Sequence, residues 1–179
     1  MKSKILLLIP AALLALVGCS NKEETKPNDE SSQQGDVSGG ESSDVESFST
    51  DAEGYKTVDF VPADFGEAMN EQGSFEATSK GLTLTATNSK LHLEYNSQKI
   101  ELRVYSGGTI KFTATSIKSI QFTCTAENDD KYGPGCLSAS TGSYTTSGYV
   151  GTWTGEVASV TFTAESLQTR IKSFTVSYK

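Results

Sequence analysis

The sequence predicts an all-β protein, an antiparallel β-sandwich of the jelly-roll kind, over residues 54–179. From Tyr55 onward, apolar and polar residues alternate with a period of two, which is typical of half-buried antiparallel strands. Threonine is frequent in these runs, and β-branched side chains suit a pleated, half-exposed surface. Glycine, asparagine and serine interrupt the runs at short intervals, so we expect about eight or nine strands around one core.

The expected strands are placed by apolar residues that recur at every second position. Only the stretch from Ala63 to Asn70 departs from this alternation and hints at a helical turn. The alternating runs are, in chain order, 82–86, 91–95, 100–104, 110–114, 120–124, 160–164 and 174–178.

Residues 1–18 predict a secretory signal peptide. Two lysines precede an apolar run from Ile5 to Val17, which is shorter than the roughly 20 residues that a membrane-spanning helix needs. The end of this run resembles the lipobox of bacterial lipoproteins, so we expect cleavage before Cys19 and lipidation of its thiol. An ordinary signal peptide that happens to end in a cysteine is the alternative. A multiply acylated Cys19 would attach the protein stably to a membrane.

Residues 19–53 predict a disordered, acidic tether. After Cys19 this stretch contains no Leu, Ile, Trp or Tyr and a single Phe, so it cannot bury enough apolar surface to fold. Ten acidic residues against two lysines give it a net charge of −8, whereas residues 54–179 carry −1. A flexible chain of this length reaches roughly 30 Å, so the tether would lift the folded domain off the membrane.

The residues directly after Cys19 indicate where in the cell the protein is located. Ser20–Glu24 resembles the lysine-plus-acids signal of Bacteroidetes lipoproteins that are exported to the cell surface. A solvated charge cluster in a linker is the alternative. We therefore expect an outer-membrane lipoprotein that faces the cell exterior, while an anchor that faces the periplasm remains open.

The folded region carries a series of structural motifs. In chain order these are Tyr105–Ile110, Ile117–Ile120, Thr152–Gly155, Ser159–Phe162 and Arg170–Val176. In this order the motifs resemble a β-sandwich module that recurs in Bacteroidetes secreted proteins and lipoproteins, and the likeness covers most of residues 74–179. The resemblance implies fold and setting, with an accessory or binding role, and no particular activity.

Two cysteines remain after Cys19, and they depart from the pattern of that module. Cys124 and Cys136 form an even pair in an exported domain, which predicts a disulfide. Such a bridge would stabilise the fold by roughly 3 kcal/mol in the chain-entropy account. The alternative is that Cys124, on an apolar strand face, is a free cysteine in the core.

The segment from 130 to 156 is the expected ligand-binding surface. It sets aromatic residues among Gly, Ser and Thr, a composition shared by adaptable recognition surfaces, and aromatic faces suit sugar rings and protein partners. For the tryptophan, packing in the core is the alternative. The candidate ligand-binding residues are Tyr132, Tyr144, Tyr149 and Trp153.

Composition and motifs argue against several other functions. A net charge of −7 argues against a nucleic-acid binder, and no spacing typical of a zinc site, phosphate loop or nucleophile elbow is found, so we expect no cofactor. Glu127, Asp129 and Asp130 could hold a cation, but they lack the alternating spacing of a calcium loop, which favours a solvated turn.

Catalysis has little support in the sequence. The only histidine, His92, lies on the polar side of its expected strand, without a nucleophile nearby in the sequence. Glu94 and Glu101 on adjacent strands could form an acid/base pair. We expect a surface-anchored, non-catalytic binding module for a glycan or host matrix. The alternatives are a structural or accessory subunit of a surface assembly and, less favoured, a hydrolase.

Overall fold

A computed structural model describes residues 48–94 and 98–179. The expected signal peptide, the lipidation site at Cys19 and most of the tether therefore lie outside the described residues. Within the described part most of the chain is strand, with two short 3-10 helices, η1 (Pro62–Phe65) and η2 (Pro134–Cys136). None of its helices is long and apolar enough to cross a membrane.

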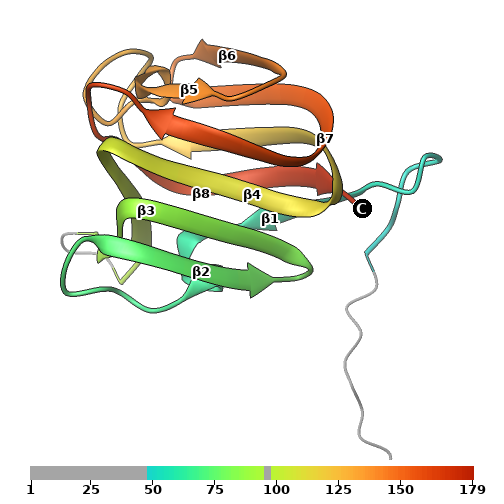
Figure 1. Ribbon diagram of the computed structural model, residues 1–179, viewed down its shortest axis with the longest axis horizontal. Helices are drawn as coiled ribbons and strands as arrows, with labels where there is room; N and C mark the ends of the chain where they lie inside the picture. The colour runs from blue at the N-terminus through green and yellow to red at the C-terminus, as the bar shows by residue number, and fades with distance from the viewer. Residues whose placement is uncertain (1–47, 95–97) are drawn as a thin grey trace, which may run out of the picture. The chain divides into compact units, whose positions relative to one another are not determined.

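Eight strands pair into a single sheet, which confirms the all-β, sandwich-like fold (Figure 1). Along one path the order is β1-β8-β4-β3-β2, and β7 adds β5 and β6 beside β4. The strands are β1 (Lys56–Phe60), β2 (Gly73–Ser79), β3 (Leu82–Leu93), β4 (Ile100–Cys124), β5 (Leu137–Ala139), β6 (Ser143–Ser147), β7 (Val150–Ala164) and β8 (Thr169–Tyr178).

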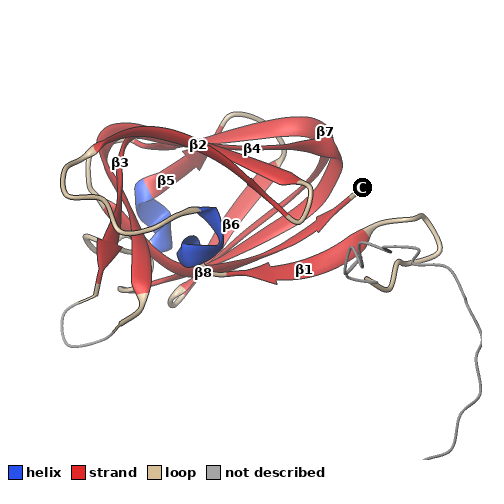
Figure 2. Cartoon of the chain, turned by 90° about the horizontal axis from the view of Figure 1, so that it is seen from below, coloured by secondary structure: helices blue, strands red, loops and turns tan. Residues whose placement is uncertain are grey.

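The long strand β4 holds the fold together because its neighbours change along its length. Its first part pairs antiparallel with β3, with Leu102 opposite Leu91. Its last part lies between β7 and β8, where Phe122 is opposite both Gly151 and Phe174. Seen from below in Figure 2, the strands curve around a shared interior. One sheet thus folds over and buries its own apolar face.

The core is filled by aromatic side chains from the expected strands. Phe122 and Phe162 meet edge to face with ring centroids 4.9 Å apart, and Phe112 meets Phe174 in the same way at 5.2 Å. These four phenylalanines are at most 1% exposed. Burying each side chain stabilises the fold by about 1.5–3 kcal/mol. The alternation in the sequence had placed all four on the inward side.

The folded body begins before residue 54, so the boundary expected after residue 53 was wrong. Thr50 bridges Lys56, and the side-chain oxygen Oδ1 of Asp51 accepts hydrogen bonds from the backbone N–H groups of Glu53 and Tyr55. Upstream, Phe48 packs against the core. Composition misled here because acidic residues depress the average hydropathy, although each of these carboxylates finds a hydrogen-bond donor.

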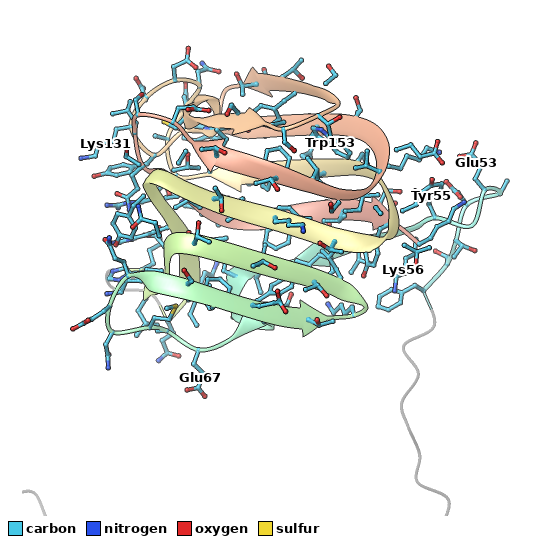
Figure 3. The ribbon with its side chains drawn as sticks, viewed as in Figure 1. Glu53, Tyr55, Lys56, Glu67, Lys131 and Trp153 are labelled. Atoms are coloured by element: carbon cyan, nitrogen blue, oxygen red, sulfur yellow. The ribbon has the colours of Figure 1, made fainter. Side chains whose placement is uncertain are left out.

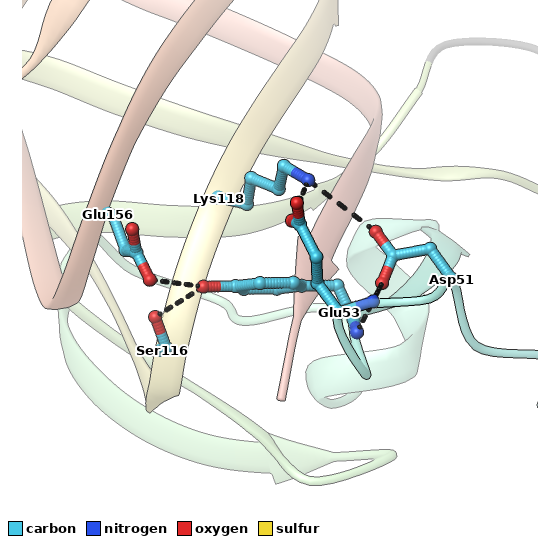
Figure 4. A network of polar contacts seen from close by, with 6 residues as sticks. Asp51, Glu53, Ser116, Lys118 and Glu156 are labelled. Atoms are coloured by element: carbon cyan, nitrogen blue, oxygen red, sulfur yellow. Dashed lines mark hydrogen bonds and ion pairs between the residues drawn. The ribbon is translucent and has the colours of Figure 1, made fainter.

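A network of polar contacts, here called the N-terminal latch, fixes this segment (Figure 4). The Tyr55 hydroxyl donates to Glu156 Oε1 at 2.8 Å and lies 3.0 Å from Ser116 Oγ. Lys118 Nζ binds Glu53 Oε2 at 2.5 Å and Asp51 Oδ2 at 3.5 Å. The latch consists of Asp51, Glu53, Tyr55, Ser116, Lys118 and Glu156.

Candidate binding site

A cavity of about 560 Å³ opens where β4 begins and where the chain leaves β1. Its lining combines charged groups from β4, from β8 and from Glu94 just after β3 with apolar side chains, and includes Val61, Glu94, Ile100, Glu101 and Lys172. Concave sites with a few convergent polar groups are the usual form of ligand-binding sites. The cavity is therefore the first candidate for a functional site.

Glu101 is a fixed carboxylate in this cavity. The residue is only 3% exposed, and its Oε1 atom lies 2.5 Å from Nε of Arg103 and 3.9 Å from NH1 of Arg170. A buried charge persists where cations and hydrogen bonds compensate it. The two guanidinium groups thus hold the Glu101 carboxylate in place.

Three cations lie side by side on the outward face of the sheet next to this carboxylate, and we call them the cationic row. Lys90 on β3 is directly opposite Arg103 on β4, and Arg103 is opposite Arg170 on β8. Like charges directly opposite each other destabilise a sheet. Lys90 Nζ donates to the backbone carbonyl of Asn70 at 2.6 Å, which is a neutral acceptor.

Tyr132 covers one side of the cationic row. The guanidinium carbon of Arg170 lies 3.6 Å from the centroid of the Tyr132 ring, and Lys131 Nζ lies 5.2 Å from it. Tyr132 adopts a φ of 84°, and its backbone N–H and C=O bond to Gln168 and Arg170. Tyr132 is thus the one expected aromatic residue that contacts this charged face.

Two of the expected ligand-binding aromatics pack in or against the core. For Tyr144 the assignment to a binding surface was wrong, and for Trp153 the alternative of packing in the core is confirmed. Trp153 is fully buried, and its Nε1 donates to the Thr141 carbonyl at 2.5 Å. A Cβ on Gly155 would come within 2.5 Å of the indole ring, so the Trp-x-Gly spacing makes room for Trp153 against its own strand.

Tyr144 is partly buried and packs against the core. Its ring meets Phe162 edge to face at 5.5 Å, and its hydroxyl donates to the Pro134 carbonyl at 2.9 Å. Burial raises the pKa of the Tyr144 phenol above its ordinary value. Strand β6 turns this side chain toward the core cluster, whereas the serine- and threonine-rich composition of its segment had suggested a surface loop.

Tyr149 is the expected ligand-binding residue that the structure leaves exposed, at 49%. A hydrogen bond with the Glu127 carboxylate raises the pKa of its phenol. Glu127 belongs to the acidic segment between β4 and η2, for which the sequence favoured a solvated turn over a cation site. The described residues contain no group of three or more His, Cys, Asp or Glu side chains placed to hold a metal ion.

Cys124 and Cys136 are free and buried in the structure, so the expected disulfide is not formed there. Burial raises the pKa of the Cys124 thiol to about 12, with Cys136 as a further contributor. The Cys136 thiol donates to the Asp130 carbonyl at 3.2 Å. Both cysteines therefore act as small packing residues, which was the alternative for Cys124.

The two glutamates considered as an acid/base pair do line one cavity. Glu94 Oε1 lies 3.9 Å from Lys172 Nζ, and Glu101 is bound by two guanidinium groups. His92 lies directly opposite Glu101. Partial burial, followed by the positive charges of Arg103 and Lys90, lowers the pKa of His92 below 6.5. The neutral imidazole is therefore favoured beside the cationic row.

No protein-family model, curated protein or solved structure matches this chain. The function must therefore be argued from the geometry of the site.

Sequence reasoning missed the residues that form the cationic row. Arg103 stands at an outward position of the run 100–104 and Lys90 directly precedes the run 91–95, a signal that could have placed the two together on one face. Arg170 was noted only as part of a structural motif. Its position beside Arg103 depends on the pairing of β4 with β8, which no local pattern indicates.

Proposed function

We propose that this protein is a lipid-anchored lipoprotein of the cell surface and that its β-domain is a non-catalytic module that binds a glycan. The cavity around Glu101 carries this proposal. It offers carboxylate, ammonium and amide groups for sugar hydroxyls, next to the apolar side chains of Val61 and Ile100. Sites that recognise polar ligands combine such fixed polar groups with apolar walls.

The arrangement of the described body suits display from a membrane. Glu53, Tyr55 and Lys56 lie at one end of the molecule, where the chain enters the sheet, and Lys131 lies at the other end (Figure 3). Lys131 contacts Tyr132, which stacks on Arg170 of the cationic row. A tether that joins the body at the Tyr55 end would leave the charged face toward the surroundings of the cell.

Binding can be tested with the full-length chain on a glycan array and a panel of matrix proteins. Val61 is 49% exposed and lines the cavity, whereas Leu167 is 40% exposed and lies outside it. We expect Val61→Trp to fill the cavity and weaken binding by about tenfold or more, a loss of at least 1.4 kcal/mol. The matched variant Leu167→Trp should bind like the wild type.

Two outcomes would overturn the proposed binding. The first is that the wild-type chain binds none of the glycans and matrix proteins tested. The second is equal loss of binding in the Val61→Trp and Leu167→Trp variants, which would show that added apolar surface, rather than a filled cavity, interferes.

The lipid anchor is tested separately. Labelled fatty acid should enter the wild-type protein and not Cys19→Ser, and that variant should leave the membrane fraction. Equal labelling of the two proteins would remove Cys19 as the anchor. External protease added to intact cells should degrade the wild-type domain if it faces outward.

A hydrolase is the second candidate, because Glu94 and Glu101 line the same cavity. Glycosidases use two carboxyl groups on either side of the scissile bond. A cation lies close to each of these carboxylates, an arrangement that suits ligand binding at least as well. If the protein releases shorter products from a bound glycan and the Glu94→Gln variant does not, the function is hydrolysis rather than binding alone.

A further inference from the structure

Two buried donors mark the start of β8. Among the described residues, the buried side-chain nitrogen and oxygen atoms without a hydrogen-bond partner are Gln168 Nε2 and Arg170 Nε. Alternate residues of an extended chain lie on the same side, so both side chains leave the strand on one face. Since both atoms are donors, an acceptor is what they lack.

The same face carries a local excess of positive charge. Lys90, Arg103, Arg170 and Lys172 are outward neighbours on β3, β4 and β8, and Glu101 is the carboxylate among them. Glu94 approaches Lys172 at 3.9 Å. Residues 54–179 have a net charge of only −1, so the excess is a property of this face and not of the whole domain. Such a patch attracts anions.

The stacking of Arg170 fixes how an anion could approach. Tyr132 lies against the face of the guanidinium group, 3.6 Å from its carbon, and the hydrogen-bond donors of arginine project from the edge of that plane. A carboxylate or sulfate group meets such an edge with two oxygen atoms at once. The Arg170 side chain is 23% exposed, while its Nε atom is buried, so an anion would approach the end of the side chain that carries the terminal nitrogen atoms.

The spacing of the cationic row favours a repetitive ligand. Neighbouring strands lie about 4.8 Å apart, so Lys90, Arg103 and Arg170 present positive charges at regular intervals across the sheet. A stiff polymer with an acidic group on its repeats can contact several of them together, which multiplies weak single contacts. The cavity beside the row offers polar groups for the sugar rings of such a polymer.

We propose that the outward face formed by the cationic row, Gln168 and Lys172 binds the carboxylate or sulfate groups of an acidic polysaccharide. This inference rests on the proposed glycan binding and names the class of glycan. Arg170 and Arg103 bind the acidic groups, Lys172 adds charge at the cavity, and Glu101 keeps the two guanidinium groups in position.

The test uses the full-length chain and defined polymers. Polygalacturonate supplies carboxylates and dextran sulfate supplies sulfates, while carboxyl-reduced polygalacturonate and dextran are their neutral counterparts. We expect one or both acidic polymers to bind, the neutral counterparts to bind at least about tenfold more weakly, and added salt to weaken the acidic complexes. Poly-glutamate serves as an acidic polymer without sugar.

Variants localise the site. Arg170→Gln removes the stacked guanidinium while Arg103 still compensates Glu101, and should weaken acidic-polymer binding by about tenfold or more. Lys172→Gln, at a side chain that is 45% exposed, tests the same face without risk to folding and should weaken it severalfold. Lys111→Gln is the matched control, because Lys111 is exposed on the same strand as Arg103 but faces Thr85 and Thr161. It should change binding by less than about twofold.

The outcomes separate this inference from the proposed function. Equal binding of acidic and neutral polymers, equal loss in Lys111→Gln, or no loss in Arg170→Gln and Lys172→Gln overturns the acidic site. Binding of poly-glutamate as tight as that of the acidic polysaccharides overturns the assignment to a glycan. If neutral glycans bind and acidic ones do not, glycan binding survives without the acidic site. If no polysaccharide binds, both proposals fail.

Discussion

The N-terminal latch and the cationic row are two charged regions of one sheet that use their charges differently. In the latch, Lys118 lies between the carboxylates of Asp51 and Glu53. In the cationic row, Arg103 faces Lys90 on one side and Arg170 on the other. The latch thus pairs its charges within the chain. In the row, two guanidinium groups share the single carboxylate of Glu101, so positive charge is in excess on this outward face. The first arrangement stabilises a fold, and the second is suited to a ligand.

Glu101→Gln should have the largest effect, because it removes the carboxylate that compensates the row. Breaking a buried ion pair leaves uncompensated charge, and we expect a loss of about 3 kcal/mol in the free energy of unfolding, measured by urea titration. In the latch, Glu156→Gln should cost only about 1 kcal/mol, because an amide oxygen still accepts from Tyr55. Equal losses in the two variants would erase the distinction between the regions.

Tyr55→Phe should have the next largest effect and tests whether the latch is structural. The variant removes the hydroxyl that bonds Glu156 and Ser116 and leaves Glu156 without its donor. We expect the free energy of unfolding to fall by about 1–1.5 kcal/mol. Tyr105→Phe, on the outward side of β4, is the control and should be nearly neutral. Unchanged stability in Tyr55→Phe would mean that the latch does not hold the N-terminal segment.

The acid response of the latch should be smaller. The backbone N–H of Tyr55, aided by that of Glu53 and by Lys118, lowers the pKa of the Asp51 carboxyl below 3.8. A carboxyl with a lowered pKa in the folded state contributes stability above its ordinary pKa and loses it as the pH falls through the folded value. Asp51→Asn should therefore lose less stability than the wild type between neutral pH and pH 3. Parallel pH profiles would contradict this assignment.

His92 should give the smallest effect and reports on the cationic row. Its pKa is lowered below 6.5 in the folded chain, mainly by burial and then by Arg103 and Lys90, although Glu101 opposes this shift. The unfolded chain therefore binds the proton first, and stability falls as the pH is lowered through 6.5. His92→Gln should remove this part of the pH dependence. Because His92 is the only histidine, a proton NMR titration can follow it directly, and a pKa above 6.5 would contradict the prediction.

The sequence could predict the strands and the side that each residue faces. Phe112, Phe122 and Phe162 were placed inward by alternation alone, and all three are buried. It could not predict the fate of Tyr144 or of the segment at Asp51, because local composition resembles that of a surface in both places. Tyr144 is drawn in by Phe122 and Phe162 from other strands, and Asp51 by the donors of its own turn.

The sequence by itself determined that this chain forms an all-strand body with an apolar inner face, because the alternation of side chains is a local property of an extended chain. Only the tertiary structure decided which charges meet. Arg170 comes to lie beside Arg103, and Lys118 beside Glu53, through pairings between segments far apart in the sequence. The energy of a charge depends on its neighbours in space, so neither the latch nor the place of Arg170 in the cationic row could be predicted before the strands were paired.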